Sequence, residues 1–288
     1  MQELVIDSLG IPCARTTLWR LLDEQALRPW THRYWIFPRD PQFLEKASPI
    51  LNLYEGFWQG QPLQPGEYVL SVDEKTSIQA RLRLVPTVAA TPGQAARVEF
   101  EYLRQGALQY LAAWDVHRGQ VFGRCEAKTG IAPFHRLLEQ VLQEEPYRSA
   151  KRIFVIVDNG SSHRGQASIR RVRQQFPNVE LLHTPVHASW LNQVEIYFSI
   201  LQRVVLQPND YPSLQAVAEA LAEFARRYNA EAKPFAWHFR RADLQELLKK
   251  VQRYPLPKAA AKKRRTKTTQ TATPTEKCGK AVTASTCQ

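Results

Sequence analysis

The stretch KRIFVIVDNGSSHRG, residues 151–165, constrains the fold of this chain more than any other part of the sequence. Five consecutive apolar residues, Ile153 to Val157, run directly into Asp158, Asn159 and Gly160. A short β-branched run that is bounded by a charge and by turn residues is typical of a strand buried on both faces. Ligands of open α/β sheets gather at the carboxyl ends of strands, which is where Asp158 stands. The alternative is an ordinary turn, because Asp-Asn-Gly is common turn chemistry.

The remaining segments predict the other strands and the helices around them. The order is antiparallel strands first and then helices that alternate with further strands, which predicts an α/β fold with a mixed sheet flanked by helices. We expect a strand over 67–76, two consecutive hairpins over 96–128 that turn at 104–106 and 117–119, a short strand over 179–185, and helices over 132–145, 168–176, from about Leu191, over 213–230 and over 242–253.

The first residues have the pattern of a small DNA-binding unit. We expect a short helix over 1–9, a turn at 10–12 and a second helix over 14–27 with an apolar stripe of leucines. Helix, tight turn and second helix form the helix-turn-helix pattern, whose second helix enters the major groove. The alternative is a plain helical hairpin. The residues expected to face outward near the start of the second helix are Arg15, Thr16, Thr17 and Arg20.

Charge and cysteine content narrow the class of protein. Lys and Arg number 39 against 27 Asp and Glu, a net charge of +12, which favours a polyanionic partner, nucleic acid before an anionic membrane. The four cysteines, Cys13, Cys125, Cys278 and Cys287, have no metal-ligand spacing, which indicates a reducing compartment without disulfides or a zinc module. We find neither a secretory signal nor an apolar run of membrane-spanning length, and expect a cytosolic protein that does not contact membranes.

Two acids besides Asp158 have contexts that suggest a shared site. Asp73 lies at or near the end of the first predicted strand, and Glu195 is the only charged residue between Ala188 and Gln202. A helix this apolar is expected to be mostly buried, where an unpaired carboxylate costs several kcal/mol; alternatively, Glu195 lies on its single solvent-facing stripe. Three carboxylates from two strands and a helix would suit Mg²⁺ or Mn²⁺, and pairs of these ions commonly drive phosphodiester chemistry.

The segments SVDE, VIVDNGSSH and HASWLNQVEIYFSILQR, in this order, resemble the DDE transposases of the mariner superfamily, in particular the bacterial insertion-sequence branch. The 37 residues from Asp158 to Glu195 also fit that family. The resemblance implies an RNase H-like fold, and Asp73, Asp158 and Glu195 as catalytic ligands of two Mg²⁺ or Mn²⁺ ions. It also implies cutting and joining of DNA at transposon ends by a homodimer, in a cytoplasmic, nucleoid-associated setting.

The resemblance also divides the chain into parts. We expect a partial helix-turn-helix segment over 1–38, a linker over 39–66, the RNase H-like DDE catalytic domain over 67–254, and a disordered basic tail over 255–288. Members of the family usually carry two helix-turn-helix units, and this chain begins at or just before the second, so the first is expected to be missing.

Four further side chains are candidates for supporting roles. Asn159 and His163 could orient a metal-bound water or a phosphate, and His187 and Asn192 could contact DNA, although each is equally suited to a turn or a cap. Glu74 should point to the opposite face of its strand and stay out of the cage. Two other functions remain open: a structure-selective nuclease of the RNase H type, and a DNA-binding remnant of a decayed transposase.

Overall fold

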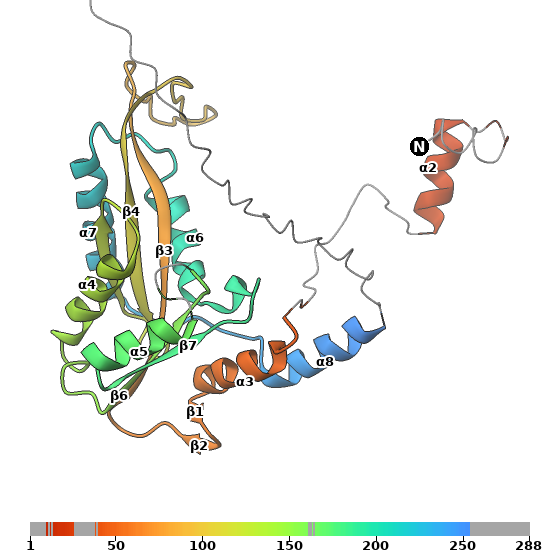
Figure 1. Cartoon of the computed structure of the whole chain (residues 1–288). Helices are drawn as coiled ribbons and strands as arrows, with labels where there is room; N and C mark the ends of the chain where they lie inside the picture. Colours follow the sequence, from red (N-terminus) through yellow and green to blue (C-terminus); the bar gives the residue numbers. More distant parts are fainter. Residues whose placement is uncertain are drawn as a thin grey trace, which may run out of the picture.

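The computed structural model describes residues 10, 12, 14–25, 38, 40–160, 163 and 165–253. Its centre is a five-stranded sheet in the order β5-β4-β3-β6-β7 (Figure 1). β3, β4 and β5 are antiparallel neighbours, whereas β6 and β7 run parallel to β3, so the predicted mixed sheet is confirmed. The strands are β3 (Glu67–Leu82), β4 (Leu103–Asp115), β5 (Val121–Glu126), β6 (Arg152–Val157) and β7 (Val179–His183).

The register of β3 against β6 decides where the site can form. Their parallel pairing runs from Glu67 opposite Arg152 to Ser71 opposite Ile156. Asp73 and Asp158 therefore lie two residues beyond the last pair on each strand. Because side chains alternate along a strand, both acids project to the same face as Ser71 and Ile156. Past this point β3 continues and, among the residues that the structure describes, pairs only with β4.

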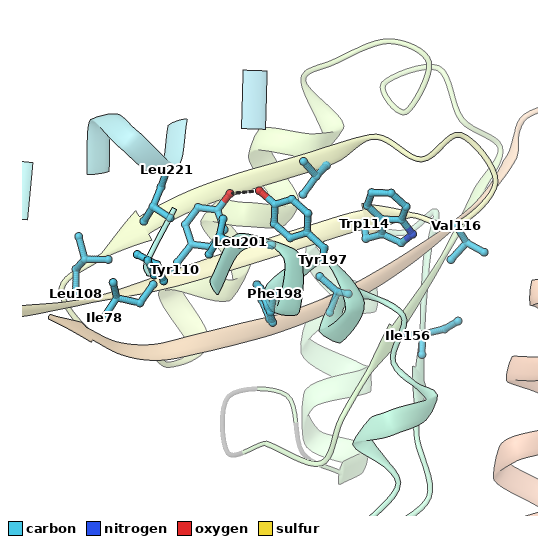
Figure 2. Packing of buried hydrophobic residues seen from close by; sticks show 14 of the residues in the cluster. Ile78, Leu108, Tyr110, Trp114, Val116, Ile156, Tyr197, Phe198, Leu201 and Leu221 are labelled. Atoms are coloured by element: carbon cyan, nitrogen blue, oxygen red, sulfur yellow. Dashed lines mark hydrogen bonds between the residues drawn. The ribbon is translucent and has the colours of Figure 1, made fainter. Parts of the chain in front are cut away.

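Helices cover both faces of the sheet and create two cores. On one face, α4 (Ile131–Leu142) and α5 (Gly165–Gln175) contribute side chains to a core with Val72, Val155 and Val157. On the other, α6 (Val194–Val204) and α7 (Leu214–Ala230) pack against Phe154, Ile156 and the aromatic residues of β4. Figure 2 shows this second core, in which the hydroxyls of Tyr110 and Tyr197 are 3.1 Å apart. The face that carries Asp73 and Asp158 is thus the face that α6 covers.

The segment over 39–66, expected to be a linker, is folded. It contains α3 (Phe43–Tyr54) and a short hairpin of β1 (Phe57–Trp58) and β2 (Gln61–Pro62). Ile50 and Leu53 of α3 are fully buried in the α6 core, and α8 (Arg241–Gln252) packs beside α3 through Leu244. The apolar residues of α3 recur at helical spacing and are buried, which is why this segment forms a packed helix and not a linker.

One of the two predicted hairpins is wrong. No turn occurs at 104–106, since β4 runs through these residues and pairs with a β3 that extends to Leu82. Gly106 instead has a positive φ of 96° at a bulge, where a Cβ would come within 3.1 Å of Leu214. The second turn is confirmed, with the Gly119 N–H donating to the Asp115 carbonyl.

At the N-terminal end, α2 (Arg15–Glu24) forms within the predicted second helix, and none of its residues is buried. Arg15, Thr16, Thr17 and Arg20 are all exposed. The helix expected over 1–9 and the tail over 255–288 lie outside the described residues, so the helix-turn-helix remains a prediction. In the part of the chain that the structure describes, no helix is long and apolar enough to cross a membrane.

Candidate active site

The three predicted acids come from three elements that meet at one face of the sheet. Asp73 lies on β3, Asp158 follows β6, and Glu195 lies in the first turn of α6, which packs on β3. Their charges interact, since Asp158 and Glu195 both raise the pKa of Asp73, and Asp158 raises that of Glu195. Glu74 lies on the opposite face, because it alternates with Asp73 and shares the side of Leu70 and Val72.

Asp73 is the most strongly perturbed of the three acids. Burial raises its pKa to about 7, and the charges of Asp158 and Glu195 add to that effect. The Glu74 N–H, which donates to Asp73 Oδ1 at 2.7 Å, and the nearby His163 oppose it. A carboxylate pushed toward neutrality by burial and by like charges is one that a cation would stabilise.

The pKa of Asp158 is shifted in the opposite direction to that of Asp73, below its usual value. His163 Nε2 donates to Asp158 Oδ1 at 2.6 Å, and the Gly160 N–H donates to the same oxygen at 2.7 Å. The hydrogen bond from His163 is the main reason that the pKa of Asp158 is lowered, against the effect of burial. His163 itself is buried and packs against Phe134. The structure thus places His163 directly on the second acid.

Asn192 is buried behind the first acid, with only 1% of its surface exposed. Its Nδ2 donates to the Val72 carbonyl at 2.9 Å and lies 3.4 Å from Asp73 Oδ2. The Ser71 hydroxyl donates to Asn192 Oδ1 and accepts from the Val194 N–H at 3.0 Å. A side chain enclosed in this way cannot reach DNA, contrary to the expectation for Asn192. It ties β3 to the start of α6 instead.

Glu195 lies on the solvent-facing stripe of α6 and is exposed, so the alternative considered for it is the correct one. The helix begins at Val194, after a 3₁₀ turn over Ser189–Leu191, rather than near Leu191. Desolvation by its surroundings raises the pKa of Glu195, Lys75 lowers it and Asp158 raises it. Glu195 is therefore an accessible carboxylate between Lys75 and Asp158, and no buried charge has to be explained.

A cleft of about 490 Å³ opens beside Asp158. Its walls are residues 158–160 and the loop 184–189, and the Asn159 amide donates to the Thr184 carbonyl at 2.7 Å to join the two. His187 stands exposed on this loop with a positive φ of 61°, a conformation that is uncommon outside glycine. Asn159 thus supports the cleft wall, while His187 faces solvent beside the acids.

Several residues of the site carry no functional signal in the sequence. Gly160 reads as a turn residue, yet a Cβ there would lie 2.9 Å from Asp158 Oδ1 and 3.0 Å from His163 Nε2. Asp40 accepts from the Val186 N–H at 2.9 Å and from Lys46 Nζ at 2.8 Å, and so fixes the loop 184–189 to α3. The Asp-Pro-Gln-Phe order before an apolar run is a usable signal for a helix that starts just after Asp40, as α3 does at Phe43. It gives no sign that Asp40 contacts a loop 146 residues away.

The donor set fits a hard divalent cation in its chemistry. Its members are carboxylate oxygens, the ligands that Mg²⁺ and Mn²⁺ prefer, and their mutual repulsion is what a cation would relieve. As placed, no three His, Cys, Asp or Glu side chains among the described residues stand close enough together to hold an ion. The acids share one electrostatic environment without forming a closed cage.

Comparisons with known proteins agree with this arrangement. A family model for "DDE superfamily endonuclease" matches residues 68–218. The fold is similar to that of the Mos1 mariner paired-end complex with Mn (17% identity, 87% of this chain and 72% of that chain, TM-score 0.53). It is also similar to a pre-cleavage Mos1 transpososome (15% identity, 88% and 75%, TM-score 0.54). No curated protein matches the sequence. At these identities the likeness concerns the fold, which is RNase H-like, as predicted.

Proposed function

Since this chain belongs to the DDE superfamily endonuclease family, we propose that it is a DNA transposase of the mariner superfamily, from the bacterial insertion-sequence branch. It cleaves the ends of its transposon and joins them to target DNA, as a homodimer that pairs two ends in the cytoplasm, at the nucleoid. The observation that carries this proposal is the convergence of Asp73, Asp158 and Glu195 on the face of the sheet beneath α6.

We assign Asp73, Asp158 and Glu195 as the ligands of two Mg²⁺ or Mn²⁺ ions. When bound, such ions lower the pKa of a water or 3′-hydroxyl nucleophile and neutralise charge on the leaving oxygen. The fold similarity to Mos1 complexes with Mn and with Mg supports this choice (11% identity, 88% of this chain and 72% of that chain, TM-score 0.52, for the Mg complex).

The surrounding residues would prepare the acids for this role. His163 keeps a proton on Nε2, which it donates to Asp158 Oδ1, so that the other oxygen of Asp158 stays available as a ligand. Asn192 and the Glu74 N–H orient Asp73, and the exposed Glu195 reaches the same space from α6. Arg15, Thr16, Thr17 and Arg20 of α2 would contact DNA at the transposon end.

The proposal is tested with Asp158→Asn. This change removes a metal-binding oxygen but preserves the shape of the side chain, so Mg²⁺-dependent cleavage of the transposon end should fall to background while DNA affinity stays near that of the wild type. Cleavage is measured on a labelled duplex and affinity by fluorescence anisotropy. Cleavage at wild-type rates would exclude the proposed role of Asp158.

Two measurements distinguish the proposed transposase from a structure-selective nuclease and from a decayed transposase. Strand joining, followed with a pre-cut transposon end and a target plasmid, is expected of a transposase and not of a structure-selective nuclease. Titration calorimetry with Mn²⁺ should show binding that Asp73→Asn and Glu195→Gln weaken, whereas a decayed core would show none.

A further inference from the structure

A second cleft, of about 410 Å³, lies next to the acids and belongs to no part of the site described so far. One wall is the second half of β3, from Lys75 to Leu82 and on to Arg83, and the other is the end of α6 with the loop over 206–209. Among the described residues, this half of β3 pairs only with β4, because β6 ends at Val157. The cleft therefore follows an open edge of the sheet that leads away from Asp73.

The lining of the cleft is cationic. No carboxylate of the described residues lies within ion-pair distance of Lys75 or Arg81, and both side chains are only half-buried. Arg81 is held in place by Tyr102, whose ring centroid is 4.5 Å from the guanidinium carbon, and by a hydrogen bond from its Nε to Gln79 Oε1 at 3.2 Å. Both contacts leave its terminal nitrogens able to donate to a further acceptor.

Arg83, the third cation of the lining, serves a different purpose. It donates to the carbonyls of Glu99 and Asn209 and lies 3.3 Å from Asp210, and only 8% of its side chain is exposed. Arg83 therefore closes the far end of the cleft and adds little free charge. The remaining polar lining consists of Thr76, Ser77, Gln79, Gln202, Gln207 and Asn209.

We propose that this cleft binds the sugar-phosphate backbone of the DNA strand that enters the catalytic centre, with Lys75 and Arg81 as its phosphate contacts. The inference rests on the proposed function, because it names the path of the substrate. Lys75 is placed at the entrance, since it acts electrostatically on Glu195 of the catalytic centre. From Asp73 to Arg81 the strand spans at most about 26 Å, at roughly 3.3 Å per residue, which is the length of about seven to eight nucleotides of duplex.

An open sheet edge can also bind an added β-strand. The charge of this cleft favours DNA over such a strand. A strand would need apolar pockets for alternate side chains, whereas here unpaired cations and amide groups surround the edge. Two unneutralised cations beside three acids would also draw the polyanion along β3 and past the carboxylates.

The test measures the salt dependence of DNA affinity in the non-cleaving Asp158→Asn protein. Each phosphate contact contributes about −0.9 to the slope of log affinity against log salt concentration. DNA affinity drops by some factor between about 50 and about 200 mM salt. Loss of one contact should make this factor about 3.5-fold smaller, and the double change Lys75→Gln with Arg81→Gln should make it about 12-fold smaller. The probe is a duplex of random sequence, followed by anisotropy.

The matched control is Arg148→Gln, which removes one exposed positive charge at the opposite end of β6 and should leave the slope unchanged. Lys75→Arg with Arg81→Lys keeps both charges and should restore the slope, which excludes a folding defect as the cause. The inference is overturned if the double Gln variant has the same slope as Arg148→Gln. Failure of the proposed function would give a different result, in which the wild-type protein binds DNA but neither cuts nor joins it.

Two further reactions in the cleaving background identify which DNA occupies the cleft. Reduced cleavage of an intact transposon end assigns it to the transposon, and reduced joining of a pre-cut end with normal cleavage assigns it to the target. If both rates of the double Gln variant equal those of Arg148→Gln, the cleft does not guide DNA.

Discussion

Asn192 is the residue on which the geometry of the first acid depends. It holds Asp73 from behind, is held in turn by Ser71, and lies only three residues before Glu195. Under the proposed function Asp73 is a metal ligand, and groups that orient metal ligands typically affect activity nearly as much as the ligands themselves.

We predict that Asn192→Ala lowers the cleavage rate per folded molecule by about 10- to 100-fold and the free energy of unfolding by about 1–3 kcal/mol. The reason is that Asp73 loses its support and the Ser71 hydroxyl loses its acceptor. The matched control is Asn229→Ala. Like Asn192, Asn229 makes hydrogen bonds through its side-chain amide, in this case two, to the backbone N–H and carbonyl of Val121, away from the acids. It should lower stability without changing the rate of the folded fraction, and equal rate losses in both variants would contradict the prediction.

At the residue scale, the sequence pointed to the three acids as candidates, whereas the contacts that hold them were not predictable. Asp73, Asp158 and Glu195 each stand in a recognisable local context, whereas the bond between Ser71 and Asn192 joins residues 121 positions apart. The apolar composition around Glu195 suggested a mostly buried helix, but α6 buries one face only, through Val194, Tyr197, Phe198 and Leu201. Composition could not say which stripe of the helix faces water. Which stripe of α6 faces solvent depends on how the helix packs on β3, and this packing is a property of the tertiary structure.

Among the elements, β5 and α4 are joined by an ionic contact outside the site. Glu126, at the end of β5, accepts from Arg136 Nε at 2.9 Å and from its Nη2 at 2.6 Å, and Arg124 donates to it as well. These guanidinium groups, Arg136 first, lower the pKa of Glu126 to about 2. Only 12% of the Glu126 side chain is exposed.

This contact should make part of the stability depend on pH. The folded pKa lies below the unfolded value, so the stabilisation is fully present above about pH 4.5 and is lost as the pH falls toward about 2. We predict that Glu126→Gln lowers the free energy of unfolding by about 1–2 kcal/mol at pH 7 and by almost nothing near about pH 2. Urea unfolding followed by tryptophan fluorescence measures it. The control is Glu145→Gln in an exposed ion pair, and a pH-independent loss in Glu126→Gln would contradict the assignment.

The elements themselves were predictable wherever a local pattern was strong. The helices over 131–142 and 214–230 follow from apolar periodicity, and the strand over 152–157 follows from a continuous apolar run that is bounded by turn residues. β4 did not, because Arg104-Gln105-Gly106 has the composition of a turn and is a strand only through its pairing with β3. Gly106 led to a wrong turn prediction because glycine is found at β-bulges as well as at turns.

For the molecule as a whole, α3 is the element that changes the expected organisation. It was predicted to be part of a linker, yet it contributes Ile50 and Leu53 to the core under α6 and, together with Asp40, secures the loop beside Asp158. The folded unit that carries the three acids therefore includes residues 40–66 and does not begin at 67.

We predict that a fragment of residues 40–253 unfolds in a single cooperative thermal transition, whereas a fragment of residues 67–253 does not. Without α3 the shorter fragment leaves the cavities of five buried side chains open, and each buried Leu or Ile lost typically costs about 2–5 kcal/mol. The five are Phe43, Ala47, Ile50, Leu51 and Leu53. Calorimetry decides, and a cooperative transition of the 67–253 fragment at the same temperature would refute the revised boundary.

The alternation of side chains along β3 sets a rule for how this protein can change over evolutionary time. Asp73 shares a face with Ser71 and Val69. Val69 and Ser71 are fixed by the pairing with β6, and Asp73 by its pairing with Ala112 of β4. Inserting or deleting one residue between 67 and 73 would turn the acid toward α4, into the apolar core, although no letter of the acidic motif had changed. Length changes in steps of two would keep it beneath α6. Among distant descendants of this sequence, the odd or even count of residues before the acid should therefore be preserved more strictly than the residues themselves.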